Sequence, residues 1–271
     1  MNWTGQLHLT ASLKNGKTIL CDSYYEGAFK VSRPVFLEED SPTYFLIHVG
    51  GGYVGGDRYN QCFHLEEGAV LTLTTQSATK VYKTTALPAK QQTTIFLEKG
   101  SFLTYLQDPV IAYEKAKYIQ ETTIEMEAGS SLLLTDMYTP GWSATQQSFT
   151  YDWIHSDMTV IYDRRKIVID HLLLQPKDQL DSILLLEGYT HFGSLLFIHE
   201  KLNDAAFHEL VEALHIFENE ARIGLSRLPV AGLLVRVLAN QTQIIEKIFA
   251  ICETVLRSEV LQKEAVFYRK Y

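Results

Sequence analysis

The chain has little cysteine and no long apolar run. Its three cysteines, Cys21, Cys62 and Cys252, are far apart in 271 residues, and no C-x-x-C pair occurs. This pattern predicts neither a disulfide framework nor a structural zinc site. No apolar stretch approaches the ~18 residues of a membrane span. The first residues also lack the basic region and apolar core of a signal peptide. We therefore expect a cytoplasmic protein without a membrane partner.

Positive charge is also scarce, and so are catalytic motifs. The formal net charge is −8 and the pI is about 5.6, whereas a nucleic-acid partner requires a basic surface. Neither the G-x-S-x-G nucleophile motif nor the H-E-x-x-H zinc motif occurs. The residues alone therefore predict no nucleic-acid partner and no enzyme.

The most distinctive stretch is a glycine-rich turn within residues 45–59. Gly50, Gly52 and Gly55 match G-x-G-x-x-G, but a dinucleotide site needs a helix directly after the glycines. The residues after Tyr59 instead alternate between apolar and polar, which predicts a strand. A nucleotide-binding enzyme built on the 50–56 turn is therefore kept only as an alternative.

Alternating apolar residues recur through most of the chain and predict many short strands. A charged residue followed by glycine precedes a strand at Gly68, Gly100 and Gly129, at a spacing of about 30 residues. This unit resembles the rungs of a layered β structure. We also expect a turn over 22–27, a solvated acidic loop over 38–42 and a strand over 182–186.

Two helices are predicted in the C-terminal third. Asn203 or Asp204 can cap the first, whose apolar residues recur at helical spacing through Phe217. The second is predicted over residues 241–256. The chain thus reads as mostly β with two late helices, and we expect a single domain over residues 1–271.

Two sets of side chains could bind a divalent ion: His208, Glu212 and His215 on the first helix, and His48, Cys62 and His64 around the glycine turn. We favour simpler interpretations, namely the polar side of an amphipathic helix for the first set and a buried cysteine with hydrogen-bonded histidines for the second. Asp57 either pairs with Arg58 or accepts N–H groups of the turn, and Lys80 is a possible cross-strand partner.

Several separate motifs, in order along the chain, resemble the UreD (UreH) family of urease accessory proteins. They occupy residues 51–58, 74–82, 108–111, 140–141, 224–229 and 232–236, and the similarity covers most of the chain. The resemblance implies a layered, β-helix-like body with two helices. It makes Gly51, Gly52, Gly55, Gly56, Arg58, Gln76, Thr79 and Lys80 structural motif residues.

The resemblance also implies a non-catalytic function. Family members form a scaffold that binds apo-urease together with the helical protein UreF and the GTPase UreG, and that assembly delivers nickel to the dinuclear site of urease. No tightly bound cofactor is implied, only transient Ni²⁺. The second helix, Arg236 and the C-terminal residues Tyr268, Arg269 and Tyr271 are expected to bind partners.

Nickel is thought to cross the protein through a water-filled tunnel. Oxygen donors along such a passage replace part of the hydration shell of the ion, whereas an apolar core cannot. We expect Asp57, Asp108 and Asp136 to contribute, with Gln76 and Thr79. The chain departs from the family in two places: Trp142 stands where an arginine is frequent, and Asp136 where a glutamate is common. The other alternative is a β-rich interaction module without a metal role.

Overall fold

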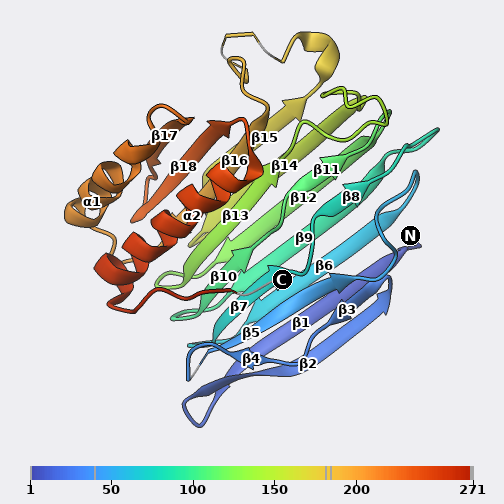
Figure 1. The fold of residues 1–271 in the computed structure, drawn as a ribbon. Helices are drawn as coiled ribbons and strands as arrows, with labels where there is room; N and C mark the ends of the chain where they lie inside the picture. Colours follow the sequence, from blue (N-terminus) through green and yellow to red (C-terminus); the bar gives the residue numbers. More distant parts are fainter. Residues whose placement is uncertain (1, 40, 181, 184, 269–271) are drawn as a thin grey trace.

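The computed structural model describes residues 2–39, 41–180, 182–183 and 185–268, and most of them lie in two stacked β-sheets (Figure 1). Sheet A has the strand order β15 (Arg165–Leu174), β14 (Trp153–Tyr162), β12 (Lys117–Met126), β9 (Ala89–Leu97), β6 (Arg58–Leu65), β1 (Gly5–Lys14) and β2 (Lys17–Gly27). The main path of sheet B is β17 (Ala221–Arg227), β18 (Gly232–Ala239), β16 (His191–Ile198), β13 (Ser131–Tyr138), β10 (Phe102–Leu106), β7 (Val70–Thr75), β5 (Pro42–His48) and β3 (Phe29–Val31). The short strands β4 (Val35–Phe36), β8 (Thr79–Val81) and β11 (Val110–Ala112) join sheet B beside this path.

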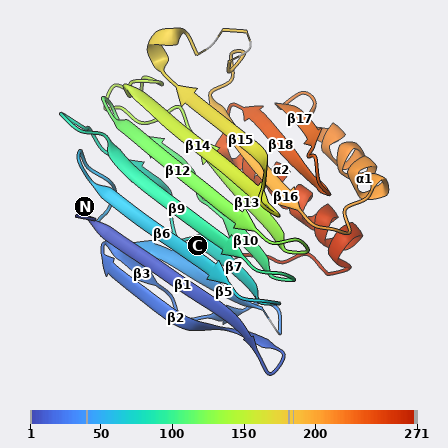
Figure 2. The same ribbon diagram turned by 180° about the vertical axis from the view of Figure 1, so that it is seen from behind.

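The chain coils between the two sheets. From β6 to β14 the longer strands fall alternately in sheet A and sheet B, and each pairs in parallel with the strand one rung away. Figure 2 shows the parallel strands of sheet A side by side from behind. The predicted layered, β-helix-like body is therefore confirmed as a stacked, β-solenoid-like coil.

Three stacked glycine turns close the rungs at one end of the coil. Gly68, Gly100 and Gly129 have φ values of 71°, 71° and 83°, a region that glycine enters at little cost. The turns are also linked, since Gly68 N–H donates to Lys99 O (3.1 Å) and Gly100 N–H to Gly129 O (3.2 Å). The recurring charged residue and glycine in the sequence thus mark the rung turns.

The helices α1 (Asp204–Leu214) and α2 (Thr242–Leu256) match the two predicted helices. The side chain of Asn203 caps α1 by accepting the Ala206 N–H (2.9 Å). Neither helix, nor any other in the described ranges, has the length and apolar character needed to cross a membrane.

Two apolar cores hold the layers together. The first fills the space between the sheets with residues such as Leu7, Phe63 and Ile95. The second lies between the outer face of sheet B and the helices (Figure 1). A Cβ at Gly193 of β16 would lie 2.5 Å from Ile245 Cγ2 of α2, so this glycine permits close packing of α2 on the sheet.

Two local predictions were wrong. Residues 22–27 do not form a turn but continue β2, because each of them pairs with a residue of β1 from Gly5 to Thr10. The strand predicted over 182–186 is absent from the described residues of that segment. Leu185 N–H donates to Ser182 O (3.2 Å) and Leu186 N–H to Leu180 O (2.8 Å), so the segment folds into local turns.

The prediction of a solvated acidic loop over 38–42 was also wrong in part, because Pro42 begins β5 and both Ser41 and Pro42 are buried. Glu38 is not simply solvated, because it binds Arg257 Nη2 (2.8 Å) and Lys263 Nζ (2.9 Å) after α2. Asp40 lies outside the described residues. The Glu38 contacts join the N-terminal part of the chain to the segment that follows α2.

Candidate functional site

A row of polar side chains runs through the interior between the sheets. On the inner face of sheet A, cross-strand register aligns Tyr59 of β6, Gln91 of β9, Gln120 of β12 and Ser156 of β14. Gln91 and Gln120 are buried. Buried amides cost free energy unless they are hydrogen-bonded, so the row requires hydrogen-bond partners inside the coil.

Buried tyrosines supply those partners. Their hydroxyls donate from Tyr53 to Gln91 Oε1 (2.6 Å), from Tyr105 to Gln61 Oε1 (3.1 Å) and from Tyr118 to Gln120 Oε1 (3.2 Å). Burial raises the pKa of all three phenols, so they remain protonated donors at neutral pH. The row is therefore a hydrogen-bonded network of uncharged oxygen and amide groups.

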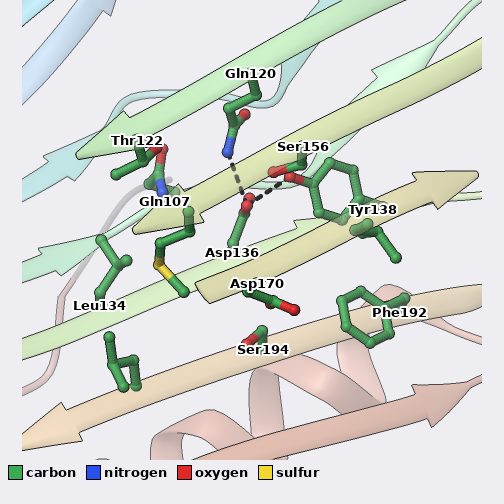
Figure 3. A pocket seen from close by; sticks show the side chains of 13 residues that line it. Gln107, Gln120, Thr122, Leu134, Asp136, Tyr138, Ser156, Asp170, Phe192 and Ser194 are labelled. Atoms are coloured by element: carbon green, nitrogen blue, oxygen red, sulfur yellow. Dashed lines mark hydrogen bonds between the residues drawn. The ribbon is translucent and has the colours of Figure 1, made fainter. Parts of the chain in front are cut away.

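Asp136 of β13 adds a carboxylate to this network (Figure 3). Its Oδ2 accepts from Gln120 Nε2 (2.7 Å) and from the Tyr138 hydroxyl (2.6 Å), and its Oδ1 accepts the Met137 N–H (3.0 Å). The carboxylate lines a cavity of about 20 Å³, room for one water molecule. Burial raises the Asp136 pKa to about 6, although the hydrogen bonds from Tyr138, Met137 and Gln120 oppose the shift.

The cavity reaches the surface between β15 and β18. Register on sheet B places Ser194 between Asp136 and Arg236, and Asp170 of β15 lines the same cavity (Figure 3). Asp170 forms an ion pair with Arg236, whose side chain is 48% exposed. Asp170 thus links the lining of the cavity to a partly exposed charged residue. The prediction that Arg236 binds a partner is not tested by this contact and stays a prediction.

Asp57 lies at the glycine-turn end of the row. Its Oδ2 accepts the Val54 N–H (2.8 Å) and the hydroxyl of Tyr59 (3.0 Å), and the Tyr59 ring stacks on Tyr53 with centroids 4.0 Å apart. Asp57 therefore stabilises the turn by accepting one of its N–H groups, which was one of the two predicted alternatives. It also contacts Tyr59, the first residue of the polar row. No ion pair joins Lys80 to Asp57 in the part of the chain that the structure describes.

The backbone after the glycine turn excludes the dinucleotide interpretation. The strand β6 begins at Arg58, directly behind the turn, so the helix N-terminus that a pyrophosphate requires is not there. The Arg58 guanidinium instead lies over the Trp3 ring, 5.3 Å from its centroid.

The glycine turn packs against the 75–80 segment and brings two of the sequence motifs together. They enclose a cavity of about 140 Å³, lined among others by His48, Gly52, Thr79 and Lys80. Tyr53 N–H donates to Lys80 O (2.7 Å), while Gln76 is exposed and its N–H binds Leu46 O (2.9 Å). Burial lowers the pKa of His48, against the opposing charge of Asp57, so its ring is neutral at neutral pH.

Asp108 lies apart from the Asp136 cavity. Its Oδ2 accepts the Thr75 hydroxyl (2.8 Å), and it lines a groove of about 570 Å³ between sheet B, α2 and the C-terminal segment. Tyr268 lines the same groove and donates to Glu253 Oε1 of α2 (2.8 Å). Arg269 and Tyr271 lie outside the described residues. The three predicted carboxylates therefore occupy three different places.

The histidine sets considered from sequence do not assemble into metal sites among the described residues. His64 and Cys62 lie on the outer face of sheet A, where His64 binds Glu98 (2.8 Å), whereas the His48 ring packs against Phe29, Tyr53 and Tyr59. On the first helix, His208 and Glu212 are exposed, and His215 interacts with Glu212 and Glu218. The contacts of His64 and of the helix residues agree with the simpler interpretations. The interpretation of the other two residues was wrong in part, because Cys62 is half-buried rather than buried and the buried His48 Nε2 has no hydrogen-bond partner among the described residues.

Sequence reasoning missed Ser156, Asp170 and Ser194 inside the cavity. It also missed His155, Asp157 and His171 on the outer face of the same strands. The only sequence signal for the residues of β14 and β15 is that successive side chains of a strand point to opposite faces, which assigns each residue to one face of the sheet. Which strands lie side by side, and therefore which of these residues meet, depends on register.

A stacked β coil with a polar row inside its core defines the class of protein: a β-solenoid-like body whose interior is polar as well as apolar. Comparison with known sequences then identifies the family. The family described as UreD urease accessory protein matches residues 4–270, and the chain belongs to it. A urease accessory protein UreD from Bacillus sp. (strain TB-90) is 45% identical over 271 residues, which is 100% of both chains. One from Staphylococcus aureus (strain bovine RF122 / ET3-1) is 38% identical over 273 residues, covering 99% of this chain and 98% of the relative.

Proposed function

We propose that the protein is a non-catalytic factor of urease maturation in the cytoplasm. In this proposal it binds apo-urease and, with UreF and the GTPase UreG, delivers nickel to the urease active site. Membership of the UreD family supports the general role. The nickel passage is implied by the resemblance to the family, and Asp136 with its cavity is the observation that supports it here.

The chemistry of the row suits transit of a divalent cation. A bare Ni²⁺ ion cannot cross an apolar core, because loss of its hydration costs tens of kcal/mol by Born estimates. Tyrosine hydroxyls, glutamine carbonyls and the Asp136 carboxylate can replace part of the hydration shell. Hard oxygen ligands bind nickel less tightly than histidine or cysteine, so an ion in this row can also leave it.

The ion pair between Asp170 and Arg236 adds a means of control. An arriving cation competes with Arg236 for the Asp170 carboxylate, and Arg236 must release Asp170 before the ion can bind there. Between Asp57 and Asp136 the space is filled by side chains, since Tyr53, Tyr105 and Tyr118 are at most 3% exposed. Movement of an ion along the whole row therefore requires these side chains to shift.

Reconstitution tests the proposal. The urease operon is expressed without this chain, with the wild type and with Asp136→Asn, and nickel content and urea hydrolysis are measured on purified urease. We expect urease to stay nickel-poor and inactive without the chain and to recover with the wild type. With Asp136→Asn we expect recovery to fall several-fold, because the amide lacks the charge that binds the cation.

Glu125→Gln is the matched control. Glu125 lies on β12, as Gln120 does, but is exposed on the outer face of sheet A, so this variant should restore activity fully. Fully loaded urease without the chain would contradict the maturation role. Full urease activity with Asp136→Asn, at an equal level of the accessory protein, would contradict the nickel passage. The alternative of an interaction module without a metal role would then remain.

A further inference from the structure

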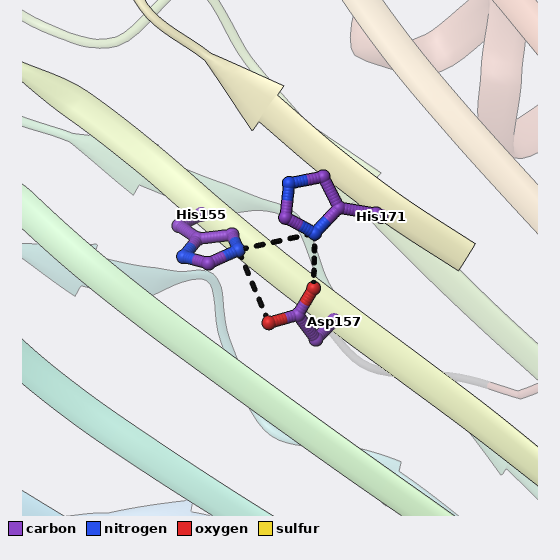
Figure 4. Close-up of side chains that lie close together, drawn as sticks. All are labelled: His155, Asp157 and His171. Atoms are coloured by element: carbon purple, nitrogen blue, oxygen red, sulfur yellow. Dashed lines mark hydrogen bonds and ion pairs between the residues drawn. The ribbon is translucent and has the colours of Figure 1, made fainter. Parts of the chain in front are cut away.

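Three potential metal ligands meet on the outer face of sheet A, on the opposite side of the strands from the Asp136 cavity. His155 and Asp157 are two residues apart on β14, so both point to the same face. The antiparallel register of β14 and β15 places His171 directly opposite Asp157. Figure 4 shows the two imidazole rings and the carboxylate turned toward one another.

The ligand atoms are already close together. His155 Nε2 lies 3.1 Å from Asp157 Oδ2, His171 Nδ1 lies 2.6 Å from Asp157 Oδ1, and the two ring nitrogens are 3.3 Å apart. Metal–nitrogen bonds of about 2.0–2.1 Å place neighbouring ligands roughly 3.0–3.4 Å apart, depending on geometry. The separation of the two ring nitrogens therefore suits joint coordination of one ion.

The ligand types also select a class of ion. Two imidazoles and one carboxylate bind first-row transition-metal ions more strongly than they bind Mg²⁺ or Ca²⁺, which prefer ligand sets made of oxygen atoms alone. The side chains of His155, Asp157 and His171 are 31%, 42% and 62% exposed, so water can occupy the remaining coordination positions. The nearby Glu121 already binds Lys90 (2.6 Å) and Gln92 (2.8 Å), which leaves these three residues as the ligand set.

We propose that His155, Asp157 and His171 form a surface site for one divalent first-row transition-metal ion. The proposal does not rest on nickel transfer through the interior, because the two sites lie on opposite faces of β14 and share no residue. Because metal ions bind the deprotonated forms of their ligands, the affinity should fall as the pH drops.

The test uses the full chain alone, titrated calorimetrically with Ni²⁺, Zn²⁺ and Co²⁺ at pH 7.5 and pH 5.5. The Co²⁺ complex is also followed by its visible absorption, which reports direct ligation. We expect one ion per chain. His155→Ala, Asp157→Asn and His171→Ala should each weaken binding by at least about tenfold, because loss of a residue that only hydrogen-bonds to a metal ligand already lowers metal affinity by about 10–100-fold. The visible Co²⁺ bands should weaken or shift in the same variants.

His64→Ala is the control, because His64 lies on the same outer face and binds a single carboxylate, Glu98. It should keep wild-type affinity. Circular dichroism of each variant excludes unfolding as the cause of lost binding. The proposal is overturned if the wild type binds no ion saturably, or if the double variant His155→Ala/His171→Ala binds as the wild type does. In that case Asp157 serves only as the hydrogen-bond acceptor of the two rings.

Discussion

Asp136 is a residue that lowers the stability of the folded chain at neutral pH. Its pKa rises from an ordinary value of 3.8 to about 6, chiefly because burial disfavours the ionised carboxylate. Between these two values the folded chain binds more protons than the unfolded chain. The contribution of Asp136 to the free energy of unfolding is therefore greatest at low pH and falls as the pH rises from about 4 to 6.

We predict that Asp136→Asn stabilises the protein at pH 7.5. The shift of about two pH units is worth up to about 3 kcal/mol, and loss of one hydrogen bond to the amide reduces the gain to about 1–2 kcal/mol. Urea unfolding at pH 4.5 and pH 7.5 measures the difference in the free energy of unfolding between the variant and the wild type. The variant should be more stable than the wild type at pH 7.5, and this difference should disappear at pH 4.5. An equal difference at both pH values would contradict the assigned pKa.

Trp142 is a second residue at which this chain departs from the resemblance. It is 51% exposed, forms a bridge with Tyr113 and packs against its ring with centroids 4.9 Å apart. An aromatic pair thus stands where a charged residue was expected. The contact is within the chain, so the substitution is compatible with the fold.

At the scale of elements, the glycine turn depends on two adjacent glycines for different reasons. Gly51 and Gly52 both have positive φ, 75° and 152°. A Cβ at Gly51 would meet nothing within 4 Å, whereas a Cβ at Gly52 would lie 2.7 Å from Lys80 O. Only Gly52 is therefore needed for close approach to the 75–80 segment.

This difference predicts unequal costs for two alanine substitutions. Gly51→Ala should destabilise the protein by about 1–2 kcal/mol, the cost of a left-handed alanine. Gly52→Ala should cost about 3 kcal/mol or more, because overpacking against the Lys80 backbone adds to the strain. Urea unfolding of the two variants measures the difference, and equal losses would show that the turn does not pack as described.

Elements were predictable from sequence where their cause is local. The rung turns follow from Gly68, Gly100 and Gly129, and α1 follows from the Asn203 cap and a 3.6-residue period. The failures occurred where a distant segment decides. Residues 22–27 form a strand because β1 pairs with them, and Ser182 belongs to local turns rather than to a sheet.

The candidate site was predictable only in part, for the same reason. Asp136 was expected to contribute to the passage because of the family resemblance, and it lines the cavity. Asp170 and Ser194 were not expected, since they meet Asp136 through the register of β15 and β16, which no short motif encodes. Asp108 lines the groove between sheet B, α2 and the C-terminal segment, apart from the Asp136 cavity, and its contribution to a passage stays a prediction.

At the scale of the whole molecule, one ion-pair cluster joins the two ends of the chain. Arg257, whose side chain is 6% exposed, binds Glu38, and Lys263 binds the same carboxylate. Burial favours a higher Glu38 pKa, but the hydrogen bonds and charges of Arg257 and Lys263 together outweigh it and lower the pKa. The stabilisation is therefore present above the ordinary pKa of 4.5 and is lost as the pH falls through the lowered value.

We predict that Glu38→Gln destabilises the protein by about 1–3 kcal/mol at pH 7, because it leaves the buried Arg257 charge without its counter-ion. Lys263→Ala is the control: the Lys263 side chain is 38% exposed, so its loss should cost less than about 1 kcal/mol. Thermal unfolding at pH 7 compares the two. Losses of equal size would indicate that Arg257 is not the buried member of the cluster.

The Glu38–Arg257 contact spans 219 residues, and this has a consequence during synthesis. Each parallel strand pairs with the next rung about 30 residues later, but Arg257 cannot pair with Glu38 until residue 257 has left the ribosome. Such non-local pairing folds slowly and exposes unpaired strand edges meanwhile. The nascent chain should therefore be more prone to aggregation before residue 257 emerges than after it.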